Sequence, residues 1–100
     1  MWSIFNPPKY NVTVWLKICP SMSRIEETLY DVAGEDPYQS FESNDAKDYH
    51  WGFDSSEDAI ELIERFKSVA EDPTVIVLRL SSRDTSLESF TVKDARRLRH

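Results

Sequence analysis

The sequence predicts a single α+β domain in which two helices cover one face of an antiparallel β-sheet. The first observation is a strictly alternating segment at 11–19 (NVTVWLKIC), which is typical of a strand with one apolar face. The second is a pair of segments that carry apolar residues at helical spacing behind capping residues. The third is the apolar, β-branched run at 74–80 (TVIVLRL), which favours a strand covered on both sides.

The length of the chain and its first residues define the unit that folds. One hundred residues can build one hydrophobic core and are too few for two, so residues 1–100 are predicted to form one domain. Within it, residues 1–10 carry Trp2, Ile4 and Phe5 ahead of Pro7 and Pro8, a pattern typical of an extended arm. Such an apolar arm packs either on its own domain or on a partner.

The first helix is predicted from Arg24 to Ala33. Ser23 and Glu26 have the spacing of a capping box, and Gly34 suits a C-cap with positive φ. The second helix follows Asp54 and Ser55, which are two overlapping N-cap candidates, and it ends near 72–73.

The segments between and after the helices supply the remaining strands. Residues 38–43 and 48–54 predict a hairpin, with Tyr49, Trp51 and Phe53 on one face and His50 on the other. A short strand at 89–93 and a basic tail at 94–100 end the chain. The order strand, helix, strand, strand, helix, strand resembles the ferredoxin-like βαββαβ sandwich, with the arm and the last strand as additions.

The charge is unevenly distributed along the chain, and this asymmetry predicts the class of partner. Residues 26–64 hold thirteen acids and one base, whereas residues 65–100 hold eight bases and five acids. A formal charge of −6 disfavours binding to membranes and to nucleic acid. A nucleic-acid binder that uses an open sheet face is therefore the third function hypothesis. The first hypothesis is therefore a non-enzymatic interaction module that binds a basic protein, as an inhibitor or immunity protein does, through Glu57, Asp58 and Glu61.

The sheet face opposite the helices is a second candidate contact surface. If Val12 and Val14 face the helices, Trp15 must lie on the other face, together with Val75 and Val77. An exposed apolar face of this kind usually marks an interface. It predicts either a homodimer closed over Trp15 or a face covered by the N-terminal arm.

The alternative function is a small dimeric α+β barrel enzyme with His50 as general base. This role requires a substrate pocket and a carboxylate that orients the imidazole. The lone Cys19 is expected to be a packing residue, and the spacing of Asp45, Asp48 and Asp54 does not match an EF-hand loop. We therefore predict no metal site and no cofactor, and the absence of a cysteine pair favours a cytoplasmic protein.

Overall fold

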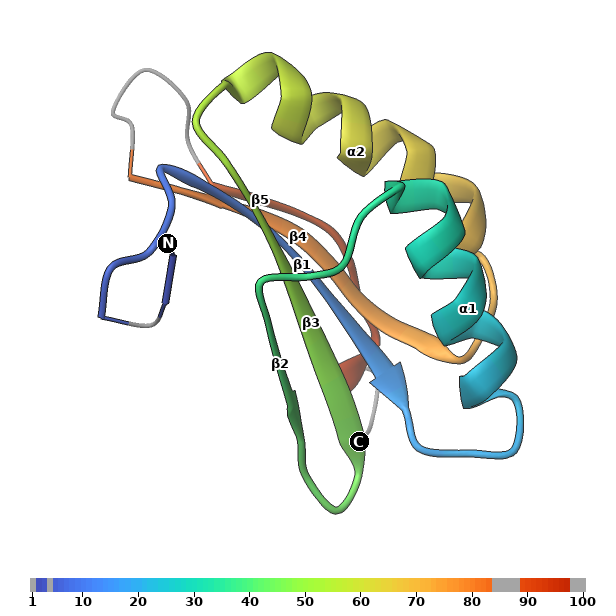
Figure 1. Ribbon diagram of the computed structural model, residues 1–100. Helices are drawn as coiled ribbons and strands as arrows, with labels where there is room; N and C mark the ends of the chain where they lie inside the picture. The colour runs from blue at the N-terminus through green and yellow to red at the C-terminus, as the bar shows by residue number, and fades with distance from the viewer. Residues whose placement is uncertain (1, 4, 84–88, 98–100) are drawn as a thin grey trace.

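The computed structural model describes residues 2–3, 5–83 and 89–97, and it confirms an α+β fold with one open antiparallel sheet and two helices. The elements are β1 (Tyr10–Lys17), α1 (Met22–Ala33), β2 (Gln39–Glu42), β3 (Ala46–Phe53), α2 (Ser56–Val69), β4 (Val75–Ser82), β5 (Phe90–Asp94) and the 3-10 turn η1 (Ala95–Arg97). Figure 1 shows α1 and α2 on the same side of the sheet. We call this side the helix face and the opposite side the second face.

The strands lie in the order β2-β3-β1-β4-β5, and each pairs with its neighbours in antiparallel fashion. The alternating segment at 11–19 is therefore the central strand, and the predicted hairpin forms one edge of the sheet. The predicted strand at 89–93 is also present, one residue later, as β5 at the other edge. The last three residues of the predicted basic tail lie outside the described residues, as does Ile4 of the arm.

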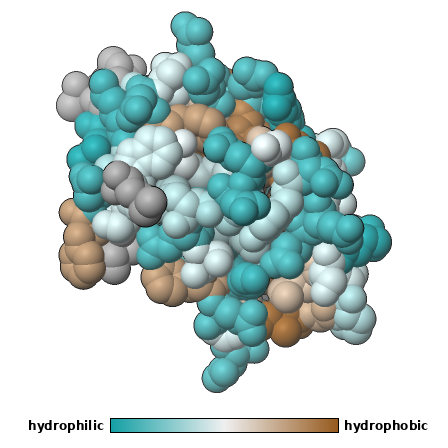
Figure 2. All heavy atoms as spheres, viewed as in Figure 1, coloured by the Kyte–Doolittle hydropathy of each residue, from teal (hydrophilic) through white to brown (hydrophobic). Residues whose placement is uncertain are grey.

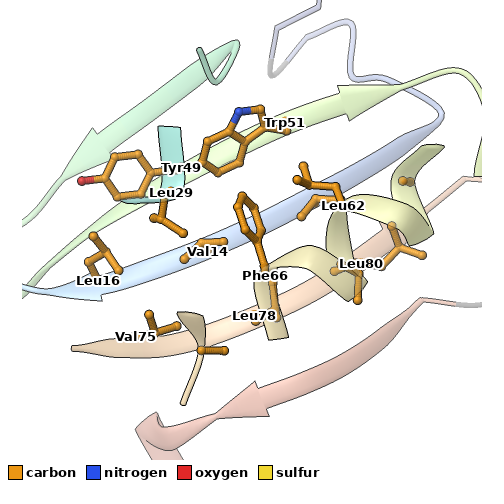
Figure 3. Packing of buried hydrophobic residues seen from close by; sticks show 14 of the residues in the cluster. Val14, Leu16, Leu29, Tyr49, Trp51, Leu62, Phe66, Val75, Leu78 and Leu80 are labelled. Carbon is orange, nitrogen blue, oxygen red and sulfur yellow. The ribbon is translucent and has the colours of Figure 1, made fainter. Parts of the chain in front are cut away.

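The core lies between the helices and the helix face, and aromatic rings dominate one end of it. In Figure 3, Trp51 and Tyr49 of β3 and Phe66 of α2 lie side by side over the sheet. The Trp51 ring centroid is 5.2 Å from that of Phe66, and all three rings are fully buried. This arrangement confirms the apolar face predicted for the segment at 48–54.

A β-bulge corrects the predicted face of Val75. The register runs from Trp15 opposite Val77 to Leu16 opposite Val75, so Ile76 is an extra residue on β4. An inserted residue reverses the alternation on either side of it. Val75 therefore packs in the core with Leu16, while Val77 stays on the second face and is completely buried there.

The start of α1 also differs from the prediction. The helix begins at Met22 with Ser21 as N-cap, so Ser23 lies inside its first turn. The Ser21 hydroxyl contacts Thr74 Oγ1 at 2.6 Å, and the Glu26 carboxylate accepts from Lys47 instead of closing a capping box. Tertiary partners have replaced the local capping contacts that the spacing predicted.

The start of α2 and the end of α1 agree with the sequence pattern, whereas α2 ends at Val69, before the predicted end near 72–73. Ser55 accepts a hydrogen bond from the Asp58 backbone at the start of α2, and Gly34 ends α1 with φ of 74°. β1, however, ends at Lys17, and Ile18, which continues the apolar alternation of the predicted strand, is 38% exposed.

The N-terminal arm covers one end of the second face. A Cβ atom added at Gly52 would lie 2.6 Å from Trp2 Cε3 and 2.7 Å from Pro8 Cγ. The arm can therefore pack against this position only because glycine has no side chain. The Trp2 ring also meets Tyr38 edge to face at 6.0 Å. Figure 1 shows this N-terminal segment on the side of the sheet away from the helices.

Gly52→Ala is expected to displace the arm from the second face. Because the new methyl group overlaps both Trp2 and Pro8, the cost of overpacking is about 1–3 kcal/mol unless the arm leaves. Tryptic cleavage after Lys9, followed by mass spectrometry, should therefore be faster than in the wild type. The exposed Ser40→Ala variant on β2 is the control, and equal cleavage rates in both variants would contradict the arm contact.

Candidate binding surfaces

An acidic groove lies where the end of α1 meets the first half of α2. It encloses about 150 Å³, and its lining residues are Ala33, Glu35, Phe53, Asp58, Glu61, Leu62 and Arg65. Apolar side chains from β3 and both helices alternate with the three carboxylates. We call this site the helix groove.

Of the three acids predicted to bind a basic partner, Asp58 and Glu61 line the helix groove. Glu57 is exposed on the first turn of the same helix and is not part of the lining. Glu61 forms an ion pair with Arg65, whereas Glu35 and Asp58 form none among the described residues. The helix groove therefore carries more negative than positive charge.

The acids of residues 26–64 do not form one continuous patch. Asp48 lies on the second face, where it pairs with His50 at 3.3 Å. Glu26 is half-buried beside Lys47 at 2.9 Å. The predicted acidic surface is therefore narrower than its charge count suggests and is concentrated around the helix groove.

Glu26 joins α1 to β3 through a tyrosine and a lysine. The Tyr49 hydroxyl and the Lys47 ammonium both donate to Glu26 Oε2. The hydrogen bond from Tyr49 is the largest cause of a lowered pKa for the Glu26 carboxyl, and Lys47 lowers it further. Burial and the adjacent carboxylate raise the pKa of Tyr49 well above its ordinary value, so its hydroxyl remains a donor.

Tyr49→Phe should reduce the free energy of unfolding by about 1–2 kcal/mol at neutral pH, since the ring stays and only a hydrogen bond to a charged group is lost. A carboxyl whose pKa is lowered by folding stabilises the fold above its unfolded pKa, and that contribution disappears as the pH falls through the folded pKa. The difference between the two proteins should therefore shrink below the ordinary Glu pKa of 4.5. Denaturant melts at several pH values measure it, and a difference independent of pH would contradict this role of Glu26.

His50 is held in a hydrogen-bonded network on the second face. Its Nε2 lies 3.3 Å from Asp48 Oδ2, which supplies the orienting carboxylate that a general base requires. Its Nδ1, however, lies 3.2 Å from both Asn11 Nδ2 and Thr13 Oγ1. The Tyr38 hydroxyl completes the network by donating to Asn11 Oδ1. Both ring nitrogens of His50 therefore have partners within the chain.

Trp15 lies on the second face, as predicted, but it is half-buried. The Arg96 guanidinium stacks over its ring at 4.4 Å and is anchored by Asp94 at 2.7 and 2.9 Å. Beside the ring, a hollow of about 90 Å³ opens toward the edge strand β2, where Phe41 is 54% exposed. The N-terminal arm, over Gly52, and Arg96 of η1, over Trp15, thus cover the two ends of the second face.

Cys19 lies in a hollow of about 340 Å³ ahead of α1. Its thiol contacts the Ser21 hydroxyl at 3.2 Å, and this hydrogen bond is the largest cause of its lowered pKa. Among the described residues, no group of three or more His, Cys, Asp or Glu side chains is arranged to hold a metal ion. No helix in the described ranges is long and apolar enough to cross a bilayer.

Sequence reasoning missed Glu35 in the helix groove and Arg79 on the second face. Glu35 follows the end of α1, where only the packing of α1 against α2 brings it to Asp58. Arg79 had a visible signal, because it is the one charged residue in the apolar run at 74–80. Figure 2 shows a mainly hydrophilic face on which hydrophobic side chains form small separate patches.

No known protein family, curated protein or solved structure matches this chain.

Proposed function

We propose that the protein is a non-enzymatic interaction module that binds a basic partner protein through the helix groove. The helix groove presents the carboxylates of Glu35, Asp58 and Glu61 around an apolar floor. Such a site suits a lysine or arginine side chain, since its aliphatic stem can pack on the floor while its charge meets the carboxylates.

The single observation that carries this proposal is the unpaired charge of the helix groove. Glu35 and Asp58 face it without a basic partner among the described residues, in a chain whose residues 26–64 carry thirteen acids and one base. Uncompensated carboxylates at one site raise the association rate of a positively charged partner.

We also infer a ferredoxin-like architecture for the domain, with β5 added outside β4. The first six elements follow the β-α-β-β-α-β order, and β1 lies between β3 and β4, which supports this assignment. The likeness concerns the arrangement of elements and carries no function by itself.

The other hypotheses remain predictions, and the geometry favours them less. An enzyme based on His50 has its carboxylate in Asp48 but no ring nitrogen left for a substrate. A homodimer closed over Trp15 would have to displace or incorporate Arg96 and the N-terminal arm.

The test is capture of a partner from the native host on immobilised protein, followed by mass spectrometry. Three baits are compared. The first is the wild type, and the second, called the groove variant, carries Glu57→Lys, Asp58→Lys and Glu61→Lys. The third is a control in which the exposed Glu42, Asp45 and Glu71 become Lys. Both variants carry the same net charge, so non-specific attraction changes equally. A protein retained by the wild type and the control, but not by the groove variant, supports the proposal. Equal retention by both variants contradicts it.

A further inference from the structure

Two buried hydrogen-bond donors on the second face have no acceptor. Within the described residues, Trp15 Nε1 and Arg79 Nε are the buried side-chain nitrogens that lack a partner. Buried polar groups are nearly always hydrogen-bonded, and an orphaned donor loses its hydration without compensation. An acceptor supplied from outside the chain could satisfy both donors, because they lie on the same face of the sheet.

The sheet register places these two donors near each other. Trp15 is opposite Val77 across the β1–β4 pair, and Thr13 is opposite Arg79. Trp15 and Arg79 are therefore diagonal neighbours on the same face, a relation that separates residues by roughly 7–8 Å. Side chains as long as Arg and Trp span that distance, so one small ligand can reach both.

The charge around Arg79 favours an anion. No carboxylate among the described residues forms an ion pair with Arg79. Of the three acids near this face, Asp48 contacts His50, Asp94 binds Arg96, and Glu42 lines the hollow on the β2 side of Trp15. Arg96 itself stacks on Trp15 and adds a second guanidinium. Arg79 is therefore the guanidinium on this face that has no carboxylate partner among the described residues.

We propose that the second face binds a small organic carboxylate between Trp15 and Arg79. The planar fork of a guanidinium matches a carboxylate, and the indole N–H donates to an acceptor on the same ligand. The arm over Gly52 and the η1 turn over Trp15 cover the ends of the face, which limits the ligand to small-molecule size. Arg79 and Arg96 are long, partly exposed side chains, so their rotation opens the two shielded donors.

Nuclear magnetic resonance can follow the two donors directly. Succinate is titrated into ¹⁵N-labelled protein at constant ionic strength while the Trp15 indole and Arg79 Nε–H signals are recorded. Both signals should shift together along one saturable curve, and the indole signals of Trp2 and Trp51 should move less. Inorganic phosphate is titrated in parallel to distinguish a carboxylate site from a general anion site.

Arg79→Gln should weaken succinate binding by about tenfold or more, because it removes the charge and the fork. Arg24→Gln, which removes an exposed charge on α1, is the matched control and should bind like the wild type. If Arg79→Gln loses its dispersed spectrum, Arg79→Lys serves instead, since it keeps the charge and removes only the planar fork. The proposal is overturned if the wild type shows no saturable shift, if both variants bind equally, or if phosphate binds and succinate does not.

Discussion

Trp51→Ala should lower the free energy of unfolding by about 3–5 kcal/mol, the range for deleting a large ring from a packed core. Trp51 is 1% exposed and contacts Phe66, Tyr49 and Tyr30 through its ring. Its indole N–H also donates to the Glu35 carbonyl at 3.0 Å, which ties β3 to the end of α1. The variant loses this hydrogen bond and leaves a cavity between the sheet and both helices.

Denaturant unfolding followed by circular dichroism measures this loss. Phe41→Ala is the matched control, because it deletes a ring from β2 that is 54% exposed, and it should cost less than about 1 kcal/mol. A loss below about 1 kcal/mol for Trp51→Ala would mean that the aromatic cluster does not hold the helices on the sheet.

The fold could be predicted where the local pattern and the tertiary contacts agree. The alternation at 11–19 and at 48–54 identified the core faces of β1 and β3 because each strand has one covered face. Val75 was assigned to the wrong face because a bulge adds one residue, and a period of two cannot reveal an insertion that depends on the partner strand. The capping box at Ser23 failed because Tyr49 and Lys47, distant in sequence, bind its Glu26.

The candidate sites depend still more on contacts that span the chain. Composition identified the acidic half and placed Asp58 and Glu61 correctly on an exposed helix surface. Composition could not distinguish acids that contact other side chains of this protein, such as Asp48, from acids that are available to bind another protein. The orphaned donors of Trp15 and Arg79 required the register of β1 against β4, which no local spacing encodes.

The Glu57→Lys, Asp58→Lys, Glu61→Lys variant should associate with the basic partner about 10- to 100-fold more slowly at low salt. Opposite charges act chiefly on the association rate, and the three replacements reverse the field at the helix groove. The side chains are exposed, so the fold should persist. Lysines in the first turn oppose the helix dipole at about 0.3–1 kcal/mol each, and thermal unfolding monitors this small loss. His50→Ala should leave the association rate unchanged.

The most direct measurement is the association rate constant of the purified partner at low and at physiological ionic strength, for the wild type, the groove variant and the Glu42, Asp45, Glu71 control. Salt screens exposed charges over a Debye length of about 8 Å at physiological ionic strength, so a rate steered by the helix groove falls as salt is added. We predict a steep salt dependence for the wild type and the control, and a slow, nearly salt-independent rate for the groove variant. Equal rates for the groove variant and the wild type at low salt would contradict the proposed function.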